Sequence, residues 1–102
     1  MYEVKAEPTF KEDYKRIVRK HPYLKNELHA AVNELIENGC VSTQYNPHIL
    51  NNAGGNYNGY IDFHLSDGEV DVIVLYLPHK TNPVIRLVRM GSHEELFHGP
   101  LL

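Results

Sequence analysis

The spacing of apolar residues differs between the two halves of this chain, and that difference limits the folds available to it. Between Pro8 and Asn38, apolar side chains recur every three or four residues, as on one face of a helix. From Gly59 onward they alternate with polar side chains, as in strands that bury one face. The pattern predicts helices in the first half of the chain and a sheet in the second.

The predicted helices have clear ends. Pro8 is suited to the first turn of a helix, and His21-Pro22 interrupts the helical spacing. A second helix follows and ends at Asn38-Gly39, a favourable C-cap. We expect the two helices to form an antiparallel hairpin.

Strands are predicted on both sides of this hairpin. Alternation over Met1–Ala6 indicates a short strand, and Cys40–Asn58, rich in Asn, Gly and Pro, is expected to form a long loop. Three further strands follow, and the middle one, Val70–Leu77, should be central because it is apolar on both faces. We expect one α+β domain over residues 1–102, in which an antiparallel sheet packs against the N-terminal helical hairpin.

The last predicted strand leads into a corner whose residues suit a functional site. Val84–Met90 alternates apolar and basic side chains, and Gly91 permits a tight exit. Ser92 followed by Glu95 has the spacing of a capping box, so a short helical turn should begin there. This places His93 at a strand-to-helix corner.

Phosphate chemistry suits that corner. Arg86 and Arg89 precede His93 in the same segment. Guanidinium groups bind phosphate oxygens, while an imidazole can donate or accept a proton near neutral pH. The segment therefore predicts a site that binds an anion and moves a proton.

The run RLVRMGSHEELF, residues 86–97, resembles the C-terminal signature of the YafQ branch of the RelE/ParE superfamily, bacterial toxins of type II toxin–antitoxin systems. The runs NPHILNN and FHLSDGEVDV resemble two further motifs of these toxins. The resemblance implies a RelE-like fold of the form β-α-α-β-β-β with a short C-terminal helical turn. It also implies a toxin that cleaves translated mRNA on the ribosome without a metal or other cofactor.

The resemblance also implies a set of site residues. The three motifs place His48, His64 and His93, with Phe97 as the aromatic side chain that helps to hold a base. The acidic member is Asp67 or Asp71.

Spacing to Tyr76 favours Asp71 over Asp67, and on that count Val72 stands where the family has Trp. His93 would act as the general acid, and Asp71 or one of the other two histidines as the base. Arg89 would stabilise the phosphate.

Other readings of these residues stay open. The basic stripe Lys11, Lys15 and Arg19 could be a solvated helix face, dock on ribosomal RNA or meet an acidic antitoxin. Tyr57 and Tyr60 could stack on bases or simply belong to the sheet.

A zinc site is a further possibility, because His48, His64, Asp71 and His93 are all ligand types. No HxxH or CxxC spacing supports it. The prediction is therefore a site without metal.

Composition narrows the classes of protein to which this chain can belong. The formal net charge is −3, which weakens the prediction of nucleic-acid binding, RNA included, without removing it. The low count of Lys and Arg does not favour sequence-specific binding of DNA by this chain alone. The single Cys40 cannot form an internal disulfide, the N-terminus does not resemble a signal peptide, and no apolar run is long enough to span a membrane. We expect a cytoplasmic protein without membrane contact.

The expected partners are a cognate antitoxin, the ribosome and its mRNA, with operator DNA bound only through the antitoxin complex. The alternative is a non-catalytic module on the same fold, either an inactive toxin or a ParE-like gyrase inhibitor. Such a module has no need of His48, His64 and His93 together, whereas RNA cleavage has.

Overall fold

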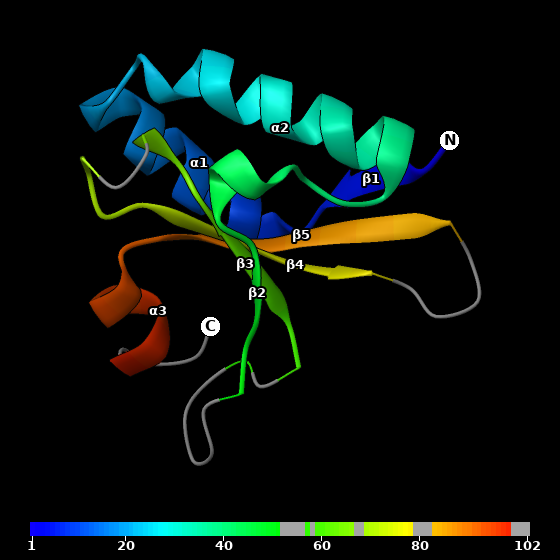
Figure 1. Ribbon diagram of the computed structural model, residues 1–102. Coiled ribbons are helices and arrows are strands. Elements are labelled where there is room, and N and C mark those ends of the chain that lie inside the picture. Colours follow the sequence, from blue (N-terminus) through cyan, green and yellow to red (C-terminus); the bar gives the residue numbers. More distant parts are fainter. Residues whose placement is uncertain (52–56, 58, 67–68, 79–82, 99–102) are drawn as a thin grey trace.

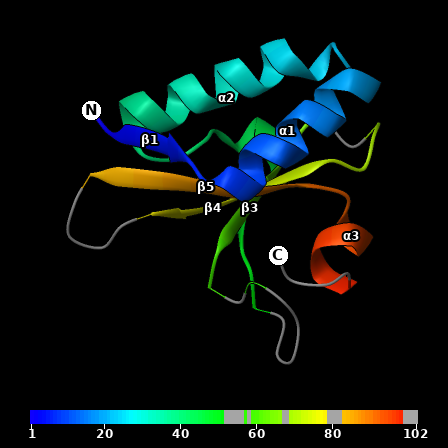
Figure 2. The same ribbon diagram turned by 180° about the vertical axis from the view of Figure 1, so that it is seen from behind.

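The computed structural model describes residues 1–51, 57, 59–66, 69–78 and 83–98. The elements are β1 (Glu3–Ala6), α1 (Pro8–Lys20), α2 (Leu24–Asn38), η1 (Thr43–Tyr45), β2 (His48–Ile49), β3 (Ile61–His64), β4 (Ile73–Pro78), β5 (Val84–Gly91) and α3 (His93–His98). The strands form one sheet in the order β1-β5-β4-β3-β2. The helices α1 and α2 cover one face of the sheet, and α3 lies on the other side (Figures 1 and 2). The predicted α+β fold with its helical hairpin is confirmed.

The pairing of the sheet is mixed, where the sequence pattern had indicated an antiparallel sheet. The strands β2, β3, β4 and β5 pair antiparallel in turn, but β1 runs parallel to β5. A parallel pair needs a long crossover between its strands, and the helical hairpin after β1 begins one.

Two boundaries also differ from the sequence prediction. The expected loop over Cys40–Asn58 contains η1 and the short strand β2. The predicted strand from Val70 begins only at Ile73, so Asp71 lies in the segment before β4. Asp67 lies outside the described residues.

Both faces of β4 are buried, which confirms its central position. Val74 and Tyr76 pack in the core beneath α1 and α2. Ile73 and Leu75 point to the opposite face and pack against Leu96 of α3. The sheet therefore has a large core under the helical hairpin and a small one under α3.

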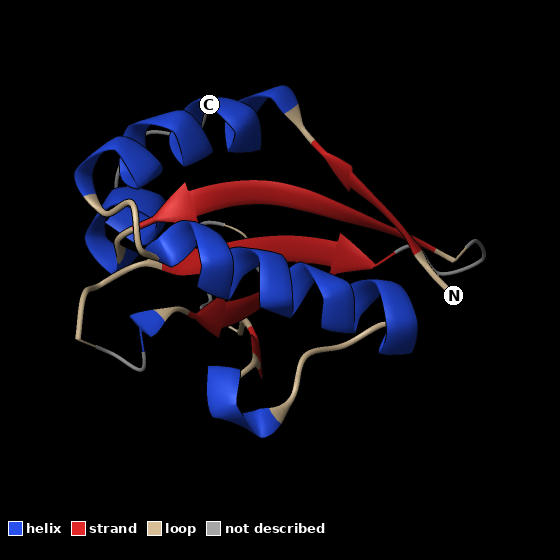
Figure 3. Ribbon diagram, turned by 90° about the horizontal axis from the view of Figure 1, so that it is seen from above, coloured by secondary structure: helices blue, strands red, loops and turns tan. Residues whose placement is uncertain are grey.

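The N-terminal part of α1 completes the edge of the sheet where β1 ends. The register of β1 on β5 stops at Leu87. Beyond it, the Thr9 hydroxyl donates to the Val88 carbonyl oxygen at 2.8 Å, and the Met90 amide donates to Oδ2 of Asp13 at 3.1 Å. Figure 3 shows α1 following β1 along this edge. Side chains of α1 thus replace a missing neighbouring strand.

Asp13 also forms a buried ion pair with Arg89. Its Oδ2 accepts from Nε of Arg89 at 2.6 Å and its Oδ1 from Nη2 at 3.3 Å. The two side chains are only 5% and 4% exposed. Because burying a charge without a partner is costly, this pair holds α1 firmly against β5.

In the described part of the chain, none of the helices has both the length and the apolar character that crossing a membrane requires.

Replacing Asp13 by Ala should lower the free energy of unfolding by about 3–5 kcal/mol, because it leaves the Arg89 charge buried and unpaired. Urea denaturation followed by circular dichroism measures this. The control is Arg16→Ala, which removes a half-exposed partner of the same carboxylate and should cost about 0–1 kcal/mol. Equal losses in the two variants would contradict the role given to the buried pair.

Candidate active site

Three histidines from separate elements lie in one row. His48 comes from β2, His64 ends β3 and His93 begins α3. The ring centroids of His48 and His64 are 5.7 Å apart, and those of His64 and His93 are 5.2 Å apart. Phe97 continues the row, with its ring centroid 5.5 Å from that of His93. The structure thus brings together the four ring side chains that the motifs singled out.

Local hydrogen bonds fix the position of His93. The Ser92 hydroxyl accepts from the Glu95 amide at 3.1 Å, which is the N-cap bond that the sequence predicted. The Glu95 carboxylate reaches Arg16 of α1 at 2.7 Å, instead of completing the capping box. A side chain on Gly91 would collide with that carboxylate, so this glycine provides space and has no unusual backbone angle.

Asp71 forms two hydrogen bonds with His93. Its Oδ1 lies 2.5 Å from Nδ1 of the imidazole, and its Oδ2 accepts from the His93 amide at 3.2 Å. An ionised carboxylate can only accept a hydrogen bond, so neutral His93 carries its proton on Nδ1 and donates it to Asp71. This leaves Nε2 as the atom with a free lone pair.

His64 is held in the same way. Its Nδ1 lies 3.2 Å from the carbonyl oxygen of Asn46. A carbonyl oxygen can only accept, so the proton of neutral His64 is also on Nδ1. Two neighbouring imidazoles therefore each present an Nε2 that can take up or release a proton.

Asp62 is a site residue that the sequence analysis did not select. It precedes His64 by two positions, pairs with His48 across the sheet and is 3% exposed. Its Oδ1 lies 3.3 Å from Nδ1 of His48 but is a buried oxygen without a hydrogen-bond partner among the described residues. The alternation of residue types along this strand does not reveal that its polar face is buried at Asp62.

His48, Asp62 and His64 could together hold a metal ion. One ligand atom of each lies within 4.8 Å of the other two. Two imidazole nitrogens and a carboxylate oxygen suit zinc, copper or nickel. This set differs from the zinc set weighed from the sequence, because it uses Asp62 and has neither Asp71 nor His93.

Arg89 of β5 is only 3% exposed. Its Nη1 donates to the Tyr57 hydroxyl at 3.3 Å, while Asp13 occupies Nε and Nη2. The hydrogen bonds that the guanidinium donates to Asp13 raise the pKa of Arg89, and burial opposes them with a smaller effect. Arg89 is therefore a fixed positive charge. Its partner Tyr57 is half-buried and packs edge-on against Tyr60.

The remaining predicted cations lie away from the histidine row. Arg86 is near the start of β5 and pairs with Glu7 at 2.9 Å. Lys11 and Lys15 line a cavity between α1 and α2. Arg19 is exposed near the end of α1.

Comparison with solved structures places this fold among bacterial toxins. A metal-bound toxin from Helicobacter pylori has 28% sequence identity and a TM-score of 0.75, with 95% of this chain and 100% of that chain covered. The DinJ–YafQ complex of E. coli contains a chain with 26% identity and a TM-score of 0.70, with 94% and 98% covered. YafQ from E. coli strain BL21(DE3) shares the fold at 24% identity, with a TM-score of 0.69 and with 91% of this chain and 94% of that chain covered.

The family of the chain follows from its sequence. Residues 2–98 match the family described as bacterial toxin of type II toxin–antitoxin system, YafQ. The chain therefore belongs to this family, as its motifs had indicated. No curated protein matches the chain significantly.

The bond between Asp71 and His93 can be tested by nitrogen NMR. Long-range ¹H–¹⁵N correlations should show that neutral His93 is protonated on Nδ1, and Asp71→Ala should shift His93 towards the Nε2–H form. The exposed His29 on α2 serves as the internal reference, since its spectrum should not change. Protonation of neutral His93 on Nε2 in the unaltered protein would contradict the geometry.

Proposed function

We propose that this toxin is an endoribonuclease that cleaves translated mRNA on the ribosome by acid–base catalysis without a metal. The observation that carries the proposal is the row of His48, His64 and His93, in which the Nδ1 atoms of His64 and His93 lie within hydrogen-bond distance of an oxygen, so that Nε2 of each neutral ring holds a lone pair. Cleavage of RNA through its 2′-hydroxyl needs a base and an acid side by side. Adjacent imidazoles meet that need.

In the proposed reaction, Nε2 of His64 takes the proton of the ribose 2′-hydroxyl, with His48 as the alternative base. The O2′ atom forms a bond to phosphorus and the bond from phosphorus to O5′ breaks. His93 enters the reaction as an imidazolium, and its Nε2 gives a proton to the departing O5′. The products are a 2′,3′-cyclic phosphate and a 5′-hydroxyl. Asp71 orients His93 and stabilises its charged form, so it is a positioning residue.

Binding of the substrate is assigned to the neighbouring aromatic side chains. Phe97 lies beside His93 and offers a ring on which a base can stack. The charge of Arg89 acts through Tyr57, whose hydroxyl accepts from Nη1 and can donate its own proton to a phosphate oxygen. Arg89 itself is only 3% exposed, so we assign the contact with phosphate to Tyr57.

The proposed partners follow from the family. The solved complex of DinJ with YafQ supports a cognate antitoxin for this chain. We extend the proposal to the ribosome and mRNA as the setting of cleavage, and to operator DNA reached through the antitoxin complex. The proposed location is the cytoplasm.

Induced expression tests the enzyme directly. The unaltered chain should arrest growth and produce new mRNA 5′ ends inside translated codons, while His93→Ala should reduce these cuts by about 100-fold or more, because it removes the acid. His21→Ala is the matched control, a histidine between α1 and α2 that belongs neither to the row nor to the lining of the cavity, and it should cut like the unaltered chain. Growth and 5′-end sequencing are followed at equal protein levels.

If no chain cuts RNA although all are folded, the enzyme assignment is wrong. The protein is then the non-catalytic module of the alternative hypothesis.

A second proposal is that a divalent transition metal binds His48, Asp62 and His64. The buried Oδ1 of Asp62, which has no hydrogen-bond partner among the described residues, favours it, and the metal-bound toxin from Helicobacter pylori supports it. The ion would supply positive charge to that oxygen. It would also occupy lone pairs that the acid–base reaction needs, so the bound form should be inactive.

Titration with Zn²⁺ should show a single site by calorimetry, and Asp62→Asn should weaken binding by about tenfold or more, because it removes the anionic ligand. Asp71→Asn is the control and should retain the affinity. Zn²⁺ should slow RNA cleavage and a chelator should restore it. Cleavage that requires Zn²⁺ would contradict this proposal.

A further inference from the structure

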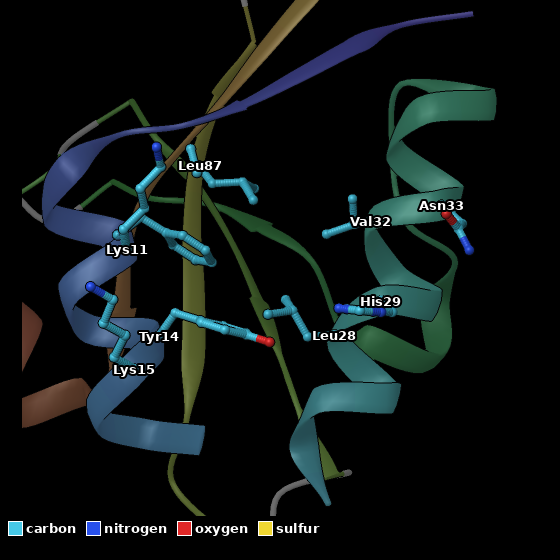
Figure 4. A pocket seen from close by; sticks show the side chains of 10 residues that line it. Lys11, Tyr14, Lys15, Leu28, His29, Val32, Asn33 and Leu87 are labelled. Carbon is cyan, nitrogen blue, oxygen red and sulfur yellow. The ribbon is translucent and has the colours of Figure 1, made fainter. Parts of the chain in front are cut away.

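A cavity lies between α1 and α2, on the face of the sheet that these helices cover. Its volume is about 530 Å³, and residues of β1, α1, α2 and β5 line it. Phe10, Leu28 and Leu87, all buried, are part of this lining. Figure 4 shows Leu28 and Leu87 together with the half-buried Tyr14 and Val32. The histidine row lies at the other face, beside α3. The cavity is thus separate from the candidate active site.

The polar residues that line the cavity stand in pairs. Lys11 and Lys15 are one helical turn apart on α1, and His29 and Asn33 are one turn apart on α2. All four side chains are exposed, and Figure 4 shows the two pairs on facing helices. Within the described ranges, neither lysine forms an ion pair. The α1 side of the cavity therefore offers two unpaired positive charges beside apolar walls.

These properties favour one class of occupant. A site for a small polar molecule needs several polar groups that converge on it, whereas the walls here are mainly apolar. A nucleic-acid surface needs many cations along a backbone, and this cavity has only two lysines in its lining. An amphipathic helix fits better, because its apolar face can enter the cavity while carboxylates one turn apart meet Lys11 and Lys15.

We propose that this cavity, called the groove from here on, binds an acidic amphipathic helix of a partner protein. This inference rests on the proposed function, in which the partner is the antitoxin. The chain carries a net charge of −3, so an acidic partner is repelled by much of its surface. The two lysines provide local attraction and set the register of the helix. Because the groove and the histidine row lie on opposite faces, this contact holds the partner but does not itself cover the histidines. A different segment of the partner must do that.

The test reverses charge at the groove and at a matched position. The variant K11E/K15E is compared with K20E/K25E, which changes the same number of exposed lysines outside the groove. The probe is the purified product of the reading frame adjacent to the gene of this chain, and calorimetry measures its binding. We expect K11E/K15E to weaken binding by about tenfold or more and K20E/K25E to change it by about twofold or less. Thermal denaturation confirms that both variants are folded.

A photo-cross-linking residue at Asn33 identifies what lies in the groove. We expect cross-links to a segment of the probe with apolar residues at helical spacing and acidic residues beside them. Cross-links that map to no such segment, equal losses in the two charge variants, or a wild-type chain that binds no adjacent product would each overturn the groove proposal. So would a K11E/K15E variant that loses affinity for ribosomes but keeps its affinity for the probe, since the groove would then be an RNA surface.

RNA cleavage, measured separately on the unaltered chain and His93→Ala, keeps this proposal apart from the proposed function. Loss of partner binding in K11E/K15E together with an inactive unaltered chain would support the groove and reject the ribonuclease. Active cleavage together with unaffected partner binding would do the opposite.

Discussion

The carboxylate of Asp13 connects most of this structure. It accepts hydrogen bonds from Nε and Nη2 of Arg89 and from the amide of Met90, so a single side chain of α1 secures both a charge and the edge of β5. A buried guanidinium without a partner would strongly destabilise the fold, so few alternative packings of α1 are possible. Since β5 runs directly into α3, the same bonds also fix where His93 begins its helix.

The sheet then separates two surfaces with different chemistry. One face carries the helical hairpin and its apolar groove, and the other carries the histidine row beside α3 (Figure 1). Arg89 links them, because it pairs with Asp13 of α1 and donates to Tyr57 beside the small core of α3. A partner that binds the groove and a substrate that binds the histidines can thus be recognised separately on a small protein.

Much of this fold could be predicted from the sequence. The ends of α1 and α2 are marked by Pro8, Pro22 and Gly39, and Gly39 indeed adopts the left-handed conformation of a C-cap. The parallel pairing of β1 could not be predicted, because it depends on how the hairpin crosses the sheet. The strand β2 was missed because two residues are too few to show alternation.

The site was only partly predictable. The motifs placed His48, His64, His93 and Asp71, and the structure brings them close together. Asp13 was missed because a carboxylate between Phe10 and Ile17 reads as a polar interruption of an apolar face.

Asp62 and the groove could not be predicted, because identifying them requires the burial of side chains and the distances between elements. The local sequence does not give these quantities.

The chemistry of the cleaved ends tests the central claim most directly. Purified toxin, ribosomes and a defined mRNA are incubated with a chelator at a magnesium concentration that just preserves the ribosomes, and the new termini are identified by mass spectrometry. Acid–base catalysis by the histidine row predicts a 2′,3′-cyclic phosphate, or the 3′-phosphate formed from it, opposite a 5′-hydroxyl. A 5′-phosphate, or the absence of any cut, would contradict the account.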